Sequence, residues 1–342
     1  MKNKIAHSQN PPQYLLLAAL GFGLVYLARK AGKALYKVSL EGKTVLITGG
    51  SRGLGLAMAG AFASAGARLV ICSRSGSQLE NARLELEESG AEVLAVQADL
   101  RNEDEVMQMV QKAVDRFGGI DVLVNNAGVM IIGPQNVMNT GDYKEAMDAN
   151  VWSALHCIKA VLPHFKAQGH IVNITSIGGR VAVPHMLPYS VSKFAMVGLS
   201  QGLSAELAKD GVKVTTVIPN LMRTGSPRNI DVKGDHQAEY AWFKTADSLL
   251  VLSQNAKSAA KRIVEAVQAG ETEITLTLTA KLAEAAQGLV PSLIVRASQL
   301  ANRLLPASND GSVKKGFECE SDLTRGRIAQ RTDRAAIRYN QH

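Results

Sequence analysis

Cysteine is scarce in this sequence, and the few cysteines are far apart. Cys72, Cys157 and Cys319 make an odd count, and none stands in a CxxC pair. This spacing argues against a disulfide-stabilised scaffold and indicates a reducing compartment. The seven histidines include no HExxH motif and no acid-flanked cluster. We therefore expect no metal site.

Motifs for nucleic-acid recognition are also lacking. The sequence has no zinc finger, recognition helix or aromatic RNA-binding signature. The formal charge is +8, and basic side chains are concentrated in residues 29–37 and 314–338. This distribution suits an anionic membrane surface better than a nucleic-acid groove, so we expect no nucleic-acid partner.

Residues 14–28 form an uninterrupted, mostly apolar run with basic residues on both sides. As a helix the run would span about 23 Å, which is short of a hydrocarbon core of about 30 Å. Tyrosines at its ends and snorkelling lysine or arginine side chains close such a gap. No good signal-peptide cleavage site follows. We predict that residues 1–37 anchor the chain in a membrane, with the domain on the cytoplasmic face; a helix packed on the domain is the alternative.

The chain of 342 residues is 46% hydrophobic, which is enough for one large α/β domain with extensions. Apolar, β-branched runs predict buried parallel strands. These runs are residues 43–48, 68–72, 92–98, 120–124, 212–218 and 273–278. We expect a Rossmann-like doubly wound parallel sheet in a single domain, residues 38–280. An N-terminal apolar helix precedes it, and a C-terminal helical extension with a basic tail, residues 281–342, follows.

A glycine-rich turn comes directly after the first predicted strand. Gly49, Gly53 and Gly55 lie in this turn, which opens an alanine-rich helical pattern. Glycines permit a tight turn and let backbone amides at a helix N-terminus approach a pyrophosphate. A strand, this turn and a helix in register are much stronger evidence than the glycines alone. The turn therefore predicts a dinucleotide site.

The end of the second strand bears on the choice of dinucleotide. An NAD enzyme is expected to place an acid there for the ribose hydroxyls, yet Ser73 and Arg74 stand there and no acid appears before Glu80. Arg52 and Arg74 offer guanidinium groups for a 2′-phosphate. NADP is therefore favoured over NAD, and two solvated arginines are the alternative.

Two further strand ends contribute candidate residues. Asp99 follows the strand 92–98 and is predicted either to accept a hydrogen bond from an adenine amino group or to cap the helix that opens at Asn102. The strand 120–124 runs into residues 125–128, which include Ala127 and Gly128. Small residues there let a cofactor lie against the backbone.

Tyr189 and Lys193 stand four residues apart in a helical pattern and so share one face. A phenol with a pKa near 10 serves as an acid or base at neutral pH only if that pKa falls by roughly 3 units. An ammonium one turn away would supply part of this shift. Ser176, in the loop before the helix, would orient a carbonyl or carbinol oxygen. A solvated pair formed by chance is the alternative.

These motifs occur together in one order: Thr48-Gly49 with Gly53 and Gly55, residues 125–128, Ser176, and Tyr189-Ser-Val-Ser-Lys193. Residues 40–278 therefore resemble the classical short-chain dehydrogenase/reductase (SDR) family. The resemblance implies an NADP(H)-dependent oxidoreductase that moves a hydride between nicotinamide and an alcohol or carbonyl substrate. It implies that Tyr189 is the general acid/base, that Lys193 lowers its pKa and holds the nicotinamide ribose, and that Ser176 orients the substrate oxygen.

The resemblance also assigns the other site residues. Asn150 stands where the family has an asparagine that holds a water for proton relay; a helix-interior side chain bonded to backbone is the alternative. The residues implied to line the coenzyme are Gly49, Ser51, Arg52, Gly53, Leu54, Gly55, Arg74, Asp99, Leu100, Asn126, Ala127, Gly128, Tyr189, Lys193, Pro219 and Thr224. One departure is Asn220, where the family usually has glycine; asparagine tolerates positive φ, so the turn is expected to survive.

Residues 221–252 are expected to form a variable lid over the nicotinamide. Apolar side chains in and near this lid suggest an apolar pocket for a hydrophobic alcohol or carbonyl compound, although packing residues would look the same. They are Met186, Leu187, Met222, Tyr240, Trp242 and Phe243.

Beyond the last strand, an apolar stripe predicts a helix with a packing face rather than a membrane surface. The stripe consists of Leu293, Ile294, Ala297, Leu300, Ala301 and Leu304. Residues 324–341 are rich in arginine and are expected to form either a short basic helix against a partner or a disordered tail.

Two other functions compete with the oxidoreductase. A catalytically silent nucleotide-binding regulatory or scaffold protein would keep this fold, but the intact Ser176, Tyr189 and Lys193 argue against it. A sugar-nucleotide epimerase is disfavoured by the glycine spacing and by the lack of a large second domain. Members of the resembled family often pair through helices near Asn150 and Tyr189, so a homo-oligomer is implied.

Overall fold

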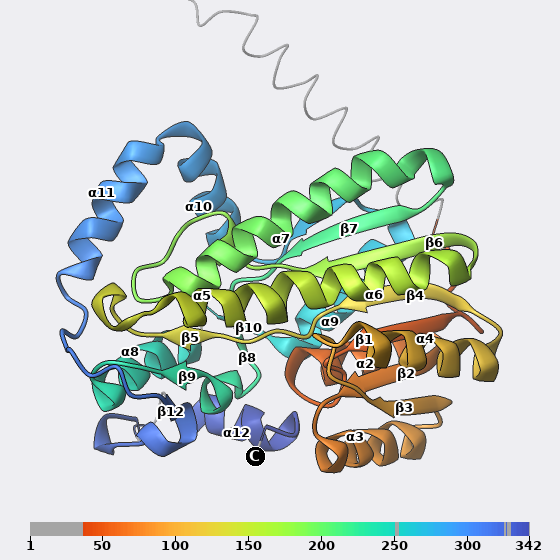
Figure 1. The fold of residues 1–342 in the computed structure, drawn as a ribbon, viewed down its shortest axis with the longest axis horizontal. Coiled ribbons are helices and arrows are strands. Elements are labelled where there is room, and N and C mark those ends of the chain that lie inside the picture. The colour runs from red at the N-terminus through yellow and green to blue at the C-terminus, as the bar shows by residue number, and fades with distance from the viewer. Residues whose placement is uncertain (1–36, 250–252, 325, 327–329, 342) are drawn as a thin grey trace, which may run out of the picture. The chain divides into compact units, whose positions relative to one another are not determined.

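A seven-stranded parallel sheet forms the centre of the fold. The computed structural model describes residues 37–249, 253–324, 326 and 330–341. The sheet has the strand order β11-β7-β6-β4-β1-β2-β3 (Figure 1). Its strands are β1 (Thr44–Thr48), β2 (Arg68–Ser73), β3 (Val93–Gln97), β4 (Ile120–Asn125), β6 (Phe165–Ile174), β7 (Lys213–Ile218) and β11 (Glu273–Thr275). Strand β2 pairs with one side of β1, and β4, which comes later in the chain, pairs with the other side of β1. Ligands of such sheets bind in the crevice at this switch point.

Helices cover both faces of the sheet, as the buried strands β1 and β4 require. One hydrophobic core joins the sheet to α2, α3 and α9, and a second core joins its other face to α4 and α6, with α7 on the same side. These helices are α2 (Gly53–Ala63), α3 (Gly76–Glu88), α4 (Glu103–Phe117), α6 (Ser153–Val161), α7 (Leu187–Glu206) and α9 (Ala256–Ala269). The doubly wound parallel fold expected from the sequence is confirmed.

A smaller assembly lies over the carboxyl ends of the strands and forms the lid. Its own core includes Ile132, Val232, Tyr240, Phe243 and Cys319. The lid elements are β5 (Ile131–Ile132), β8 (Leu221–Arg223), β9 (Asp231–Val232), α8 (His236–Ser248), β10 (Ser253–Asn255), β12 (Lys314–Lys315) and α12 (Gln330–Arg338). Helix α5 (Thr140–Met147) precedes a π-helical turn, Asp148–Trp152, that leads into α6.

The region after the sheet differs from the expectation in two ways. The last strand ends at Thr275, and Leu278 already begins α10 (Leu278–Leu289). Helix α11 (Pro291–Asn302) has no buried residue, and Leu293 and Leu300 are 62% and 63% exposed. The predicted packing face is therefore wrong within the described chain. Periodicity reveals an apolar face but not what covers it, and α11 lies at the edge of the fold beside α10 (Figure 1).

The arginine-rich end of the chain is helical where the structure describes it. Helix α12 is fixed to α8, because Lys244 forms an ion pair with Asp333 and Ser248 forms a hydrogen bond with Thr332, with distances of 2.8 and 2.7 Å. Of the two expectations for this segment, the short helix is confirmed for residues 330–338.

The predicted membrane anchor lies outside the described residues. Among the helices that the structure describes, none combines the length and the apolar character needed to cross a membrane. Residues 39–342 form one compact unit, and the proposed boundary near residue 280 stays a prediction. All three cysteines are free and buried.

Candidate active site

A cavity of about 880 Å³ opens at the carboxyl ends of the central strands. It gathers residues from the loops that follow β1 and β4, from the ends of β2 and β6, from α7 and from the lid. The predicted site residues that line it are Gly49, Ser51, Arg52, Gly53, Leu54, Arg74, Asp99, Leu100, Asn126, Ala127, Gly128, Asn150, Ser176, Tyr189, Lys193, Pro219 and Thr224. The fold thus brings together every predicted residue except Gly55.

The glycine-rich loop is tied to the end of β4. The Thr48 hydroxyl accepts hydrogen bonds from the amides of Asn126 and Ala127 at 2.8 and 3.0 Å. The Asn126 side chain donates back to the carbonyls of Thr48 and Gly49. Gly49 and Gly53 have φ values of 63° and 59°, which glycine adopts at little cost. Thr48 and Asn126 therefore shape the floor of the cavity, and the sequence analysis gave Thr48 no such role.

Gly55 lies behind the loop and does not line the cavity. A Cβ atom at Gly55 would collide with the carbonyl oxygen of Gly49 and lie 2.7 Å from Nδ2 of Asn126. Because Gly55 has a hydrogen in place of a side chain, helix α2 can pack closely on β1. This is the close-packing role of a glycine in such turns.

We expect Gly55→Ala to distort the loop and weaken dinucleotide binding at least tenfold. Gly60→Ala is the matched control, because Gly60 lies in the same helix and a Cβ there meets nothing within 4 Å. That variant is expected to bind normally and to gain up to about 1 kcal/mol of helix stability. Dinucleotide titration and thermal unfolding of both variants test the expectation, which equal binding by the two would contradict.

Two arginines place positive charge at one side of the cavity. Arg52 is half-buried and donates a 2.8 Å hydrogen bond to the amide oxygen of Asn229. Burial, together with the nearby charge of Arg74, lowers the pKa of the Arg52 guanidinium. In the described part of the chain neither arginine forms an ion pair with a carboxylate. This charge favours an anionic ligand group.

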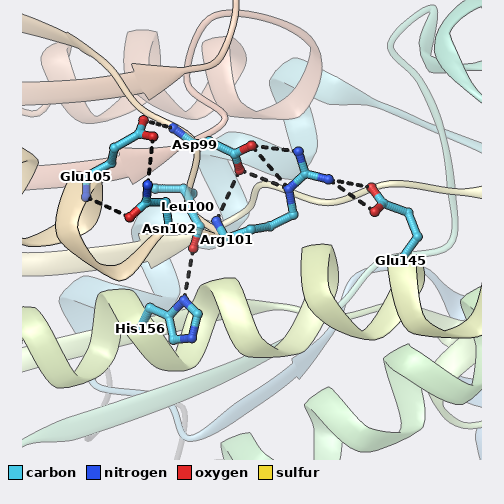
Figure 2. A network of polar contacts seen from close by, with 7 residues as sticks. All are labelled: Asp99, Leu100, Arg101, Asn102, Glu105, Glu145 and His156. Atoms are coloured by element: carbon cyan, nitrogen blue, oxygen red, sulfur yellow. Dashed lines mark hydrogen bonds and ion pairs between the residues drawn. The ribbon is translucent and has the colours of Figure 1, made fainter.

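Asp99 is held by a neighbouring arginine (Figure 2). Its two carboxylate oxygens accept hydrogen bonds from Arg101, which also contacts Glu145. These bonds to Arg101 are the largest influence on the pKa of Asp99, which they lower. The capping interpretation was wrong: Asn102 caps α4, because its side chain accepts from the amides of Asp104 and Glu105. The adenine contact stays a prediction, now for a carboxylate already bonded to Arg101.

Ser176, Tyr189 and Lys193 meet at the centre of the cavity wall. Ser176 follows β6, and its hydroxyl accepts a 3.0 Å hydrogen bond from the amide of Gly178. Tyr189 stands in the first turn of α7, and its phenol is close enough to Ser176 for that side chain to lower the phenol pKa. The Lys193 Nζ lies 5.6 Å from the centre of the Tyr189 ring and donates to the carbonyl of Ile174 at 3.1 Å.

The pKa values of this group differ from the expectation. Burial raises the pKa of Tyr189, and the hydrogen bond from Ser176 offsets only part of that rise. Burial also lowers the pKa of Lys193 to about 8. Desolvation therefore dominates the pKa of Tyr189 in the protein alone, and the lowering by Lys193 stays a prediction for the protein with its coenzyme bound.

Asn150 lies in the π-helical turn, and both the oxygen and the nitrogen of its side-chain amide form hydrogen bonds. Its oxygen accepts from the amide of Val129 at 2.7 Å, while its nitrogen donates to the Val129 carbonyl and to the Ser192 hydroxyl. This matches the backbone-bonded alternative. The side chain also lines the cavity beside Gly128, where a Cβ would lie 2.5 Å from its oxygen.

The apolar side of the cavity contains most of the predicted pocket residues. Met186, Met222, Trp242 and Phe243 line it. Two expectations are wrong: Leu187 points to solvent and is 37% exposed, and Tyr240 is fully buried in the lid core with its hydroxyl on Glu320. Sequence periodicity in α8 does not distinguish a side chain that faces the cavity from one that faces the lid core.

A buried carboxylate that the sequence analysis did not identify fixes Trp242. Glu239 is fully buried, accepts a 2.7 Å hydrogen bond from the Trp242 indole and lies 2.6 Å from Nδ1 of His185. His185 has a φ of 61°, which is unusual for a residue other than glycine. These contacts fix the loop before α7 against the lid.

The turn after β7 forms without the family glycine, but Asn220 does not adopt the positive φ expected there. Among described residues other than glycine, only His185 and Asn340 have positive φ, so Asn220 does not use the conformation expected of it. Its side chain instead accepts from the amide of Leu221 and donates to the Thr279 hydroxyl at 3.2 Å. Thr224 is buried and reaches the cavity as predicted.

A doubly wound sheet with a glycine-rich turn at its switch point defines a nucleotide-binding α/β protein. The family model for short chain dehydrogenase matches residues 43–233, more than half of the chain. The chain therefore belongs to the short-chain dehydrogenase family of oxidoreductases.

Individual relatives agree with this assignment. An uncharacterised oxidoreductase of Staphylococcus saprophyticus is 36% identical over 193 residues, which cover 55% of this chain and 81% of the relative. A 3-oxoacyl-[acyl-carrier-protein] reductase of Synechocystis is 35% identical over 198 residues, covering 57% and 80%.

Solved structures show the same fold. A short chain dehydrogenase/reductase from Burkholderia phymatum in complex with NAD has a TM-score of 0.67 at 24% identity, covering 75% of this chain and 96% of that one. A blue fluorescent protein from a metagenomic library in complex with NADPH has a TM-score of 0.59 at 27% identity, covering 70% and 98%.

Proposed function

We propose that this protein is an NADP(H)-dependent oxidoreductase that interconverts a hydrophobic carbonyl compound and its alcohol. The observation that carries the proposal is the convergence of Ser176, Tyr189 and Lys193 on a cavity that also contains the glycine-rich loop. The paired Arg52 and Arg74 support NADP, since their charge suits the 2′-phosphate and β2 ends without an acid.

The bound nicotinamide supplies or accepts the hydride. Tyr189 gives the proton to the carbonyl oxygen in reduction and takes it from the alcohol in oxidation. Ser176, which lines the same cavity as Tyr189, holds the same oxygen in line. Lys193 places its ammonium beside the Tyr189 ring, where it would also hold the coenzyme ribose. Asn150 fixes the segment at Val129, and because both of its amide hydrogens are already donated it would hold a relay water only through its side-chain oxygen.

The charge of Lys193 predicts a pH dependence of coenzyme binding. Burial lowers the pKa of Lys193 to about 8, so the group is an ammonium below that pH and a neutral amine above it. We expect dinucleotide affinity to fall as the pH rises through about 8. Titrations over roughly pH 6 to 10 check this, and the step is expected to vanish in Lys193→Met. A step of the same size in that variant would assign it to another group.

The substrate class is inferred from the apolar side of the cavity. Met186, Met222, Trp242 and Phe243 suit a lipid-like or steroid-like carbonyl or alcohol. A panel of carbonyl and alcohol compounds, followed by NADPH absorbance with protein lacking residues 1–37, tests this class. Turnover of small polar sugars alone would contradict it.

Self-association is proposed through the helices that carry Asn150 and Tyr189. Trp152, Val191 and Phe194 are 46%, 41% and 43% exposed on this face, and such exposed large apolar side chains are suited to a partner surface.

Membrane association is proposed through residues 14–28, which places the domain, residues 38–280, at the cytoplasmic face of a membrane, with 281–342 as its C-terminal extension. The apolar run and its basic flanks support this. Full-length protein is expected in the membrane pellet, and protein lacking residues 1–37 in the supernatant. A truncated protein that stayed in the pellet would contradict the anchor.

A further inference from the structure

Residues 339–341, here called the strap, lie directly on the glycine-rich loop. The amide of Gly53, at the start of α2, donates a 2.8 Å hydrogen bond to the carbonyl of Tyr339. Tyr339, Asn340 and Gln341 are only 7%, 8% and 5% exposed. Figure 1 shows the helix before the strap, α12, between the other lid elements and helix α3. The strap thus lies against the loop at which a dinucleotide pyrophosphate is expected.

Asn340 joins the loop to the following helix. Its side-chain amide donates to the carbonyl of Ser51 at 3.0 Å and to the carbonyl of Gln78, in α3, at 2.9 Å. The residue has a φ of 53°. Such a conformation costs free energy and persists where the surrounding contacts compensate for it. The two bonds use both hydrogens of the amide, so a carboxylate of the same size cannot replace it.

Gln341 connects the strap to Arg52. Its side-chain oxygen accepts a 2.6 Å hydrogen bond from Asn229, whose own oxygen accepts from Arg52 at 2.8 Å. Its amide nitrogen lies where a Cβ on Gly53 would come within 2.6 Å. Gln341 also forms part of the cavity wall. The strap therefore fixes both the loop backbone and one of the two arginines.

The strap is held from behind by helix α12, which buries Thr332 and Ala336 against its neighbours. In α12, Thr332 bonds to Ser248 and Asp333 to Lys244, and Ala336 packs so closely on Gly225 that no Cβ would fit there. With the strap in place, the cavity still measures about 880 Å³, within the range of ligand pockets. These observations describe a fixed wall beside an open site.

We propose that the strap is a wall of the coenzyme site and that Asn340 is a positioning residue, which holds the glycine-rich loop in its dinucleotide-binding conformation. The inference rests on the proposed binding of a nicotinamide dinucleotide at this loop. Since the Gly53 amide is bonded to a protein carbonyl, the amides that follow it in α2 would hold the phosphates.

The test compares Asn340→Asp with Asn309→Asp in the full-length chain. An ionised carboxylate donates no hydrogen bond to either carbonyl, so Asn340→Asp is expected to weaken NADPH and NADH binding at least tenfold. Asn309 is exposed and only accepts a bond from Asn136, which aspartate also does, so its variant is expected to bind normally. At saturating coenzyme, kcat of Asn340→Asp is expected to stay within twofold of wild type. Unchanged or tighter coenzyme binding by Asn340→Asp would overturn the proposal.

Hydrogen exchange of the wild-type protein gives a second test that needs no variant. Addition of NADPH is expected to slow exchange in peptides that cover residues 49–55 and residues 339–341 together. Faster exchange in the strap would mean that the coenzyme expels it, and the strap would then be an inhibitory plug. A wild type that bound neither dinucleotide would refute the proposed function itself, whereas normal binding with an unresponsive strap would refute only this inference.

Discussion

Replacing Tyr189 with phenylalanine is expected to lower kcat for NADPH-dependent carbonyl reduction by roughly 10²- to 10⁴-fold, which is the usual contribution of a positioned acid or base. Among the described residues of the cavity wall, this phenol is an acid–base group close to both Ser176 and Lys193. Phenylalanine keeps the ring and its packing, so NADPH binding is expected to stay within about threefold. Steady-state rates and a fluorescence titration of NADPH measure the two quantities.

Tyr143→Phe is the matched control for this substitution. Its hydroxyl donates only to Gln135 in an exposed contact and is absent from the cavity wall, so the rate is expected to be unchanged. Full activity in Tyr189→Phe would remove this residue as the acid/base. A wild type that binds NADPH yet turns over nothing in a broad panel would instead favour the silent nucleotide-binding protein.

Replacing Arg52 and Arg74 together with glutamine is expected to lower NADPH affinity by roughly 10²-fold or more, because a hydrogen bond to a charged group contributes about 1.5–3 kcal/mol. NADH lacks the 2′-phosphate, so its affinity is expected to change by less than about threefold. The selectivity between the two coenzymes, measured as a ratio of dissociation constants, is therefore the informative quantity.

Arg262→Gln is the control for the arginine pair. This side chain is ion-paired with Glu271 and does not line the cavity, so both affinities are expected to be unchanged. Equal losses for NADPH and NADH in the double variant would show that the arginines maintain the loop rather than select the phosphate. That result would leave the choice between NAD and NADP without support from this pair.

The parts of the fold that the sequence predicts well are those encoded locally. The turn between β1 and α2, and the helix that carries Tyr189 and Lys193, each depend on residues within one or two turns of one another. Their spacing alone fixes which side chains share a face. The parallel strands could be predicted equally well, because strands that are buried on both faces are continuous apolar runs in the sequence.

The parts that the sequence analysis missed depend on contacts between distant segments. Nothing in the sequence indicated that Arg101 would hold Asp99 and in turn contact Glu145 in another helix. The apolar stripe of α11 was expected to be covered, but no described element covers it. Neither the bond from Asn340 to Ser51 nor the role of Glu239 leaves any local pattern that periodicity or motif spacing would reveal.

The bond between Asn340 and Ser51 links residues that are 289 positions apart. During synthesis the sheet and its helices have all left the ribosome before Asn340 is added, and loops of this length close late in folding. A nascent chain, or one cut by a protease just before Asn340, would thus contain a folded sheet but an unfinished nucleotide pocket. Coenzyme binding is therefore expected to mature only after residues 339–341 have been added and have docked on the glycine-rich loop.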